Sequence, residues 1–392
     1  MPDRKLPSPM LTGRTIYGPE HEQFRDMCRK FFANEITPNT AQWEEDGIVP
    51  KSLWRKAGEV GLLCVTVPEQ YGGAGADLLY ASIVNEELGY TGQASVTLQV
   101  QSDIIAPYIL SLGTEEQKSA WLPKVVAGEV IGGLCLTEPG TGSDLRSIKT
   151  RAVRDGDHYV INGAKTFITN GQHADLVIVA AKTDPAAGAR GISLFLVDTT
   201  LPGFARGRNL DKIGQHCGDT SELFFEDLRL PRSALLGEEG KGFVYLMQEL
   251  PRERLVIGAL GTAAARGSLD LTLQYVDERI VFGQKLKQIQ NTRFRLAEME
   301  TDYRVNQAFI DQCISQYSRG ELDAATASMA KYSATEMQCR VADGCLQLFG
   351  GYGYTSEYPI SRAFVDARVQ RIYGGTSEVM KEVIARSLLG RD

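Results

Sequence analysis

The sequence is short of the residues that bind structural or catalytic metals. Its 392 residues include only four histidines, none in the HExxH spacing of a zinc protease, and seven cysteines, none in a CxxC pair. Closely spaced histidines and paired cysteines are the usual ligands of zinc, so a metal hydrolase and a structural zinc site are both disfavoured. An odd number of unpaired cysteines also indicates a reducing compartment. We expect no metal in this protein.

Positive charge and long apolar runs are also scarce. The formal net charge is -7, whereas nonspecific binding of nucleic acid needs a basic surface. No apolar run reaches the roughly 20 residues that a membrane span needs. The opening MPDRKLPSPML has neither an apolar signal core nor an arginine-rich amphipathic stretch. We therefore expect no nucleic-acid partner, no membrane span and a bacterial cytoplasmic location, with the mature form of a mitochondrial matrix protein as the alternative.

The chain contains three regions of different texture. From Pro19 to about residue 125, apolar residues recur at helical spacing, as in EQFRDMCRKFFANEI. Short β-branched and aromatic runs such as DLVIVAAKTD and ISLFLVDTT follow, and long helical patterns resume after GEEGKGF. Because strands and helices do not alternate, a Rossmann domain is disfavoured. We predict an α+β protein with an N-terminal helical domain (residues 1–130), a middle β domain (131–236) and a C-terminal helical domain (237–392).

Two segments of the middle region could bind a flat, polar-edged ligand. In CLTEPGTGSDL (135–145), Thr137, Ser143 and the glycine amides could donate to a phosphate or to the polar edge of a ring. In KTFITNG (165–171), Phe167 could lie against a ring and Thr169 could bond its edge. The alternatives are an ordinary β-turn and an ordinary half-buried strand. Neither segment fits the GxGxxG or P-loop pattern.

Two further segments lie in the C-terminal region. ERIVFGQKLKQIQ (278–290) contains Arg279, which suits a pyrophosphate, and a solvated helix face is the alternative. LQLFGGYGYTSEYPISR (346–362) is a glycine-rich helix exit, which a plain C-cap turn explains.

Residues that could take part in a reaction, or bind a reacting group, occur in two segments. MQELPRERLVIGA (247–259) holds Glu249 and Glu253, and Pro251 suits the first turn of a helix, which would place Glu253 near the helix start. The alternative there is a carboxylate favoured by the helix dipole, with Arg254 as a surface charge. RIYGGTSEVMKE (371–382) opens a helix behind two glycines, with a threonine placed to cap it. It resembles a cradle for an anion or a carbonyl, yet it offers no reactive side chain.

These motifs occur together and in one order. LTEPGTGSD, KTFITNG, RIVFGQ, LQLFGGYGY and IYGGTSE follow one another so that the chain resembles the acyl-CoA dehydrogenase family over essentially its whole length. The resemblance implies a helical N-terminal domain, a middle β-barrel-like domain and a C-terminal four-helix bundle. It also implies non-covalently bound FAD and a homotetramer.

The resemblance assigns the site residues. The flavin ring would contact the middle domain, and the cofactor's pyrophosphate and adenosine would contact a neighbouring subunit. Many members have tryptophan where this sequence has Phe167, so we expect slightly different ring packing. The implied cofactor-binding set is Leu136, Thr137, Gly142, Ser143, Phe167, Ile168, Thr169, Arg279, Phe282, Gln290, Gln347, Gly350, Gly351, Thr376 and Glu378. The implied substrate-binding set is Ser143, Arg254, Tyr373, Gly374 and Gly375.

The resemblance also explains the glycine at 374. Most members carry there the glutamate that removes the substrate's α-proton, whereas the isovaleryl-CoA and long-chain types take it from a helix of the bundle. Glu253 matches that alternative position and Glu249 is the second candidate; the closest resemblance is to the long-chain type. The Gly374 backbone N–H would keep its role of binding the thioester oxygen.

The implied function is α,β-dehydrogenation of a fatty acyl-CoA, of medium or long chain, in β-oxidation. Glu253 would take the α-proton, FAD N5 the β-hydride, and an electron-transfer flavoprotein the electrons. A dry pocket would raise the basicity of the carboxylate, while a helix start would oppose this effect. The alternatives are an isovaleryl-type dehydrogenase, an acyl-CoA oxidase and a flavoprotein of the same fold without this activity.

Overall fold

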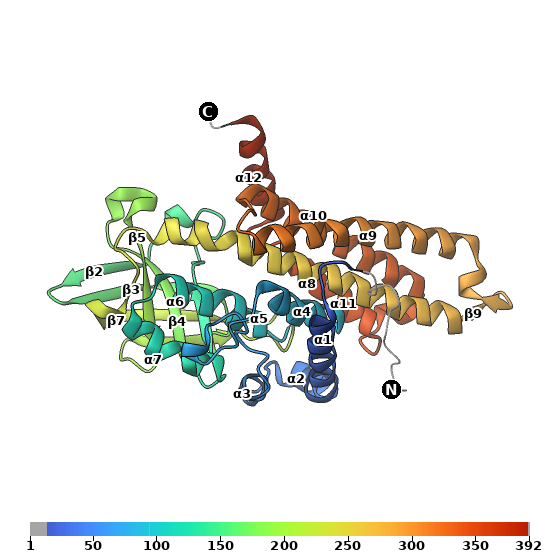
Figure 1. Cartoon of the computed structure of the whole chain (residues 1–392), viewed down its shortest axis with the longest axis horizontal. Coiled ribbons are helices and arrows are strands. Elements are labelled where there is room, and N and C mark those ends of the chain that lie inside the picture. The colour runs from blue at the N-terminus through green and yellow to red at the C-terminus, as the bar shows by residue number, and fades with distance from the viewer. Residues whose placement is uncertain (1–13, 94, 391–392) are drawn as a thin grey trace.

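The computed structural model describes residues 14–93 and 95–390. A sheet lies at one end of the long axis and a small hairpin at the other, joined by long helices (Figure 1). Within the described residues, no helix combines the length and the apolar character needed to cross a membrane.

The N-terminal part of the structure is helical, as predicted. Asp77 caps α4 by accepting a 2.9 Å bond from the Leu79 N–H, and Thr114 begins α7 with a capping box. Two of its turns are π-helical, and the second of them, η3, leads directly into α6. The elements are α1 (Pro19–Phe31), η1 (Phe32–Ile36), α2 (Thr40–Asp46), α3 (Ser52–Glu59), η2 (Glu69–Tyr71), α4 (Leu78–Tyr90), α5 (Leu98–Val100), η3 (Gln101–Ile105), α6 (Ala106–Leu112) and α7 (Glu115–Val126).

The middle part is one sheet with the strand order β6-β7-β3-β2-β4-β5-β8, and β1 pairs in parallel with β4. One face of the sheet packs on the N-terminal helices, and alternate side chains form a separate core on the other face. The elements are β1 (Gly132–Cys135), η4 (Leu145–Ser147), β2 (Arg151–Asp155), β3 (His158–Thr169), β4 (Leu176–Lys182), η5 (Pro185–Gly191), β5 (Ile192–Asp198), β6 (Phe204–Asn209), β7 (Thr220–Pro231), η6 (Arg232–Ala234) and β8 (Leu235–Leu236).

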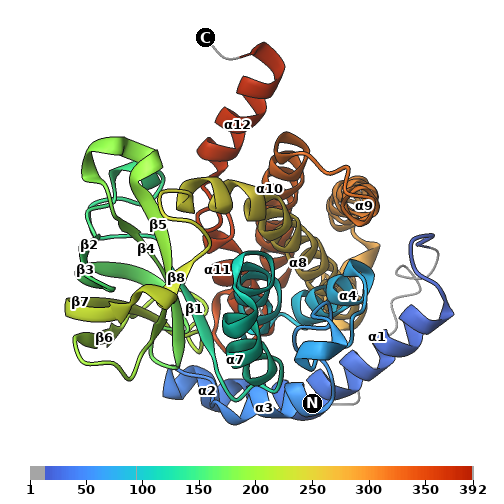
Figure 2. The same cartoon turned by 60° about the vertical axis from the view of Figure 1, so that its left-hand side comes forward.

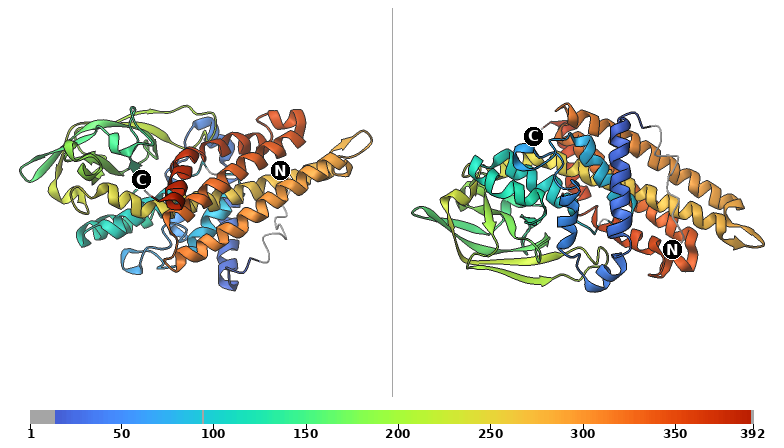
Figure 3. Two further views of the ribbon diagram at one scale, coloured as in Figure 1. Left: turned by 90° about the horizontal axis from the view of Figure 1, so that it is seen from above. Right: turned by 60° about the horizontal axis from the view of Figure 1, so that its bottom comes forward.

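The C-terminal part is built on three long helices that pack together, with α11 against α8 and α10. The last helix, α12, projects from the body of the molecule (Figure 2). The hairpin β9–β10 forms the far tip (Figure 3, left). The elements are α8 (Gly242–Glu278), β9 (Ile280–Val281), β10 (Gln284–Lys285), η7 (Leu286–Gln288), α9 (Gln290–Ser318), α10 (Ala324–Phe349), η8 (Gly350–Tyr354), α11 (Pro359–Val369) and α12 (Ser377–Leu389).

Two local expectations are wrong. Helix α8 begins at Gly242, so Pro251 lies inside the helix rather than in its first turn, and Glu253 is not at a helix start. An internal proline costs ~3 kcal/mol or more, so tertiary contacts must hold this stretch together. One is the 2.9 Å ion pair between Arg252 and Asp103 of η3. The 278–290 segment is not a helix face: it turns through Phe282 and Gly283, both with left-handed φ, as a two-residue hairpin requires.

Candidate active site

The carboxyl group of Glu253 is buried between α8 and α6. Its side chain is 7% exposed, and Oε1 accepts a 3.0 Å hydrogen bond from the hydroxyl of fully buried Tyr108. One turn earlier on α8, Glu249 accepts a 2.8 Å bond from Ser111 and is only partly buried. Tyr108 and Ser111 are three residues apart on α6, and Glu253 and Glu249 are four residues apart on α8. Residues at these spacings share one face of a helix, so the two pairs can meet. Of the two candidate bases, Glu253 is therefore the one enclosed by the protein.

Burial decides the acidity of Glu253. Removal from water raises its pKa to about 7, and the charge of Glu249 acts in the same direction. The Tyr108 hydrogen bond and the Arg254 and Arg252 charges lower the pKa without cancelling the effect of burial. Because Glu253 lies in the fourth turn of α8, the helix-start dipole expected from the sequence does not act on it. The group has the basicity of a general base that works near neutral pH.

Gly374 lies against the same stretch of α8. A Cβ atom added to Gly374 would stand 2.3 Å from Cδ1 of Ile257, which is one turn beyond Glu253. The Gly374 φ of +62° is also one that side-chain-bearing residues rarely adopt. The turn at Gly374–Gly375 and the carboxylate of α8 are thus brought to one place by the fold. Thr376 caps α12 through the Val379 N–H, as predicted.

Arg254 is inside the protein, which rules out the alternative of a surface charge. It is 4% exposed and donates a 3.1 Å bond to Ser328 of α10. Its Nε has no hydrogen-bond partner among the described residues. Burial lowers its pKa, and the neighbouring Glu253 opposes that shift. Arg254 therefore supplies a buried charge that interacts electrostatically with the base.

The two segments expected to bind the flavin ring lie side by side in the middle part. The Thr137 carbonyl accepts a 2.9 Å bond from the Thr166 N–H, which ties the loop after β1 to β3. Phe167 occupies a register shift of β3, has a left-handed φ of +58° and leaves its ring 66% exposed. Gly142 and Ser143 are exposed on the same loop. An exposed flat ring beside an exposed loop that carries backbone amides and a serine hydroxyl fits a planar, polar-edged ring such as that of FAD.

A buried ion pair supports this pair of segments. Lys165 is fully buried and donates 2.8 Å to Glu138 and 3.1 Å to the Leu136 carbonyl. Glu138 also accepts hydrogen bonds from the backbone N–H groups of Lys149 and Thr150. The loop after β1 is therefore held rigidly. Ile168 points into the core at 2% exposure, so only its backbone can reach a ligand.

Six of the cofactor candidates are at the opposite end of the molecule, whereas Thr376 and Glu378 lie at the start of α12. Arg279 follows α8 and stacks over the Tyr352 ring at 5.4 Å, and Phe282 at the hairpin tip is 96% exposed. Gln290, Gln347, Gly350 and Gly351 are exposed in the same region (Figure 1). The helix rise of 1.5 Å per residue puts the end of α8 about 38 Å from Glu253. This set is therefore far from Glu253 of the same chain.

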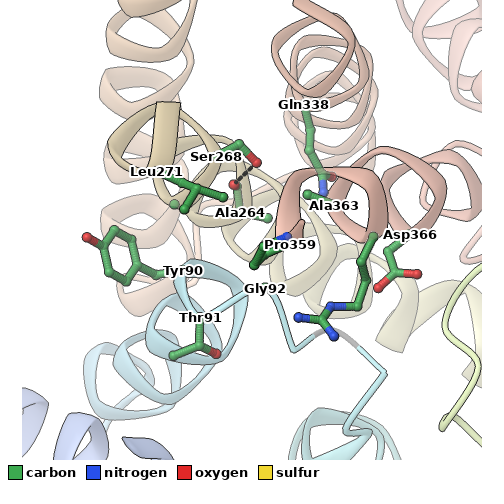
Figure 4. Close-up of a pocket in the computed structure, with 12 residues that line it drawn as sticks. Tyr90, Thr91, Gly92, Ala264, Ser268, Leu271, Gln338, Pro359, Ala363 and Asp366 are labelled. Atoms are coloured by element: carbon green, nitrogen blue, oxygen red, sulfur yellow. Dashed lines mark hydrogen bonds between the residues drawn. The ribbon is translucent and has the colours of Figure 1, made fainter. Parts of the chain in front are cut away.

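A pocket elsewhere in the structure is separate from this site. It lies between the end of α4, α8, α10 and α11 and includes Tyr90, Ser268, Gln338 and Asp366 (Figure 4). Its first residue on α8, Ala264, is about 16 Å from Glu253 along the helix. None of the predicted site residues lines it.

Several residues of the site were missed by sequence reasoning. Tyr108, Ile257 and Glu138 carry no local signal, because their partners are distant in the chain. Lys331 did carry one: it interrupts the small and apolar face of ATASMAKYSATEM, and it is fully buried. The Glu138–Lys165 pair likewise links two motifs that the sequence presents 27 positions apart.

Comparison with known proteins matches all three parts of the chain. Residues 18–129, 133–228 and 240–389 match the models for the N-terminal, middle and C-terminal domains of acyl-CoA dehydrogenase. The mitochondrial long-chain specific acyl-CoA dehydrogenase of Sus scrofa is 50% identical over 96% of this chain and 88% of its own length.

The chain is also similar to solved structures over nearly its whole length. An acyl-CoA dehydrogenase from Geobacillus kaustophilus superposes with a TM-score of 0.94 at 50% identity, covering 95% of this chain and 99% of its own. A chain in the structure of the electron transferring flavoprotein of Acidaminococcus fermentans gives 0.92 at 36% identity, with 96% and 99% covered. A glutaryl-CoA dehydrogenase from Mycobacterium smegmatis, in complex with FADH2, gives 0.91 at 31% identity, with 97% of both chains covered. The chain belongs to the acyl-CoA dehydrogenase family and is an FAD-dependent oxidoreductase that dehydrogenates acyl-CoA thioesters.

Proposed function

We propose that Glu253 is the base that removes the α-proton of the acyl-CoA. The observation that carries this assignment is the burial of its carboxyl group against Tyr108, which raises the pKa to about 7. At neutral pH about half of such carboxyl groups are ionised, and the carboxylate is far more basic than that of an exposed glutamate. Glu249 is the weaker candidate because it is partly exposed and bound to Ser111.

The turn at Gly374 complements this base. Its backbone N–H binds the thioester oxygen, where negative charge develops as the α-proton leaves. FAD, when bound, supplies the acceptor for the β-hydride. Leu136, Thr137, Gly142, Ser143 and the 167–169 segment hold its ring, and Thr376 and Glu378 contact it from the α12 side. Tyr373 and Gly375 shape the same turn, and Arg254 fixes a positive charge beside it.

The cofactor tail is held by a second copy of the chain in a homotetramer. Support comes from the gap of about 38 Å between Glu253 and the tail set along α8. It also comes from the apolar groups exposed on the far tip and on α12, such as Phe282 and Leu389. We assign domains to residues 1–130, 131–236 and 237–392. A cytoplasmic location and an electron-transfer flavoprotein as electron acceptor complete the proposal.

The substrate is a medium or long straight-chain acyl-CoA. The 50% identity to a long-chain specific enzyme supports this choice over a short branched substrate. The test is a panel of straight-chain acyl-CoA thioesters with about 4 to 18 acyl carbons, in steps of about two, together with isovaleryl-CoA. The quantity compared across the panel is kcat/KM. The highest value on isovaleryl-CoA would overturn the choice. Peroxide release equal to dye reduction would indicate an oxidase instead.

A further inference from the structure

Helix α10 holds the turn that carries Gly374 and Gly375 at two points. Lys331 donates a hydrogen bond from Nζ to the Gly375 carbonyl. Five residues further along α10, Glu336 accepts bonds from both ends of the turn, 2.7 Å from Arg371 Nε and 2.8 Å from the Ser377 hydroxyl. The turn itself is closed by a 3.0 Å backbone bond from the Ser377 N–H to the Arg371 carbonyl.

Lys331 is unusual because it is a fully buried cation. Its exposure is 0%, and α10 presents Ser328 and Thr335, also fully buried, on either side of it. Burial and, to a smaller extent, the charge of Arg254 lower its pKa to about 8, against the opposing effect of Glu336 and Glu378. At neutral pH most of the Lys331 side chains are therefore still charged.

The arrangement places positive charge behind the turn without a carboxylate bonded to it. The only hydrogen bond from Nζ recorded among the described residues goes to a carbonyl, and Glu336 is occupied by Arg371 and Ser377. Isolated buried charges are costly, so they persist where another requirement holds them. One peptide unit, between Gly374 and Gly375, separates the carbonyl of Gly375 from the peptide unit that presents the Gly374 N–H.

We propose that Lys331 is a positioning residue for the dehydrogenation: its ammonium group fixes the Gly374–Gly375 turn by binding the Gly375 carbonyl. It also keeps a positive charge behind the turn at which the thioester oxygen becomes negative. This inference rests on the proposed role of the Gly374 amide. The left-handed φ values of +62° at Gly374 and +94° at Gly375 make the turn dependent on such support, because glycine alone leaves the backbone free.

The test compares the FAD-loaded variants Lys331→Met and Lys331→Arg with wild type. Two ligands separate positioning from folding: a 3-thia-acyl-CoA, whose α-carbon ionises readily to an enolate, and an S-alkyl-CoA, which has no carbonyl. Removal of an oxyanion donor costs about 100-fold or more, so loss of its support in Lys331→Met should lower kcat about 10- to 100-fold. Affinity for the 3-thia-acyl-CoA should fall about 10-fold, while affinity for the S-alkyl-CoA stays within about twofold.

Controls keep the outcome decisive. Lys331→Arg retains charge and donor and should recover most of the lost kcat. Lys381→Met removes an exposed lysine that lies over the Tyr332 ring, and it should behave as wild type. Equal losses of affinity for both ligands, or unchanged kcat per bound flavin, would overturn the proposal.

If Lys331→Met does not fold, the same ligand pair on Glu336→Gln decides, since that variant weakens the other attachment of the turn. A selective loss for the 3-thia-acyl-CoA supports the inference, and equal losses reject it. Failure of wild type to oxidise any acyl-CoA would instead count against the proposed function.

Discussion

The hydroxyl of Tyr108 donates a 3.0 Å hydrogen bond to Oε1 of Glu253, across 145 positions of sequence. This bond stabilises the ionised carboxylate and holds its pKa below the value that burial alone would give. Tyr108 itself stays protonated, because burial and the adjacent carboxylate raise its pKa well above 10. The hydroxyl thus acts as a permanent donor that orients the base.

Tyr108→Phe should move the acidic limb of kcat/KM to higher pH. A hydrogen bond to a charged group contributes about 1.5–3 kcal/mol, so a shift of about one to two units above the wild-type limb near 7 is expected. The measurement is a pH profile of kcat/KM. Tyr159→Phe removes a similar 2.8 Å bond, from Tyr159 of β3 to Glu239, and serves as the control. An acidic limb that does not shift in Tyr108→Phe would show that this hydrogen bond does not set the pKa of the base.

Glu253 should also destabilise the folded protein above neutral pH. Its folded pKa of about 7 exceeds the ordinary 4.5, so the folded state binds this proton more tightly than the unfolded chain does. The unfolding free energy therefore falls as pH rises from 4.5 through 7, by at most about 3 kcal/mol.

Glu253→Gln removes that penalty. Its Tm should exceed that of wild type by a few degrees at pH 8 and match it near pH 5. Glu249→Gln on the same helix is the matched control and should show a smaller difference between the two pH values. A Glu253→Gln gain that is the same at both pH values would contradict the assigned pKa.

Moving the carboxylate to position 374 should depend on Ile257. A side chain at Gly374 meets Cδ1 of Ile257 and must adopt a φ of +62°, which costs about 1–2 kcal/mol. Glu253→Gly with Gly374→Glu should therefore recover little turnover, and adding Ile257→Val, which lacks that atom, should recover more. Rates of flavin reduction compare the two combinations. Equal recovery would show that Ile257 does not limit the new side chain.

Two inactive variants should complement each other if the cofactor site is shared between copies. Arg279→Ala should lose FAD, whereas Glu253→Gln should keep it and lose turnover. In a mixed assembly, an Arg279→Ala chain keeps its own Glu253. The tail of the FAD bound in that chain can be held by the intact Arg279 of a neighbouring Glu253→Gln chain. Co-expressed chains carrying different affinity tags should therefore regain FAD and activity. No activity in the purified mixed assembly would place the whole cofactor site within one chain.

The layout of the molecule was predictable because each region repeats its own pattern. Helical spacing, β-branched runs and caps such as Thr376 act locally and require no tertiary knowledge. The course of α8 was not predictable in this way. Pro251 is a local signal for a helix start, and the contacts that override it, Arg252 to Asp103 and Glu253 to Tyr108, join α8 to segments near residue 105.

The features of the site also differ in whether they could be predicted from local sequence. Glu253 stood out because it carries a reactive carboxyl group, and Gly374 because it lacks one. Both features are visible at single positions of the sequence. Their contact through Ile257, the support of Lys331 under Gly375 and the exposed ring of Phe167 arise from packing between distant segments. Position-by-position reading identified the chemical groups, and the fold supplied their relative placement.

The most direct measurement is anaerobic reduction of the bound flavin by an acyl-CoA in a stopped-flow instrument. A general base contributes about 100- to 10,000-fold, so Glu253→Gln should bind FAD and acyl-CoA normally but reduce the flavin slower by at least that lower factor. Glu249→Gln should remain within a few-fold of wild type. Flavin reduction in Glu253→Gln at close to the wild-type rate would contradict the assignment of the base.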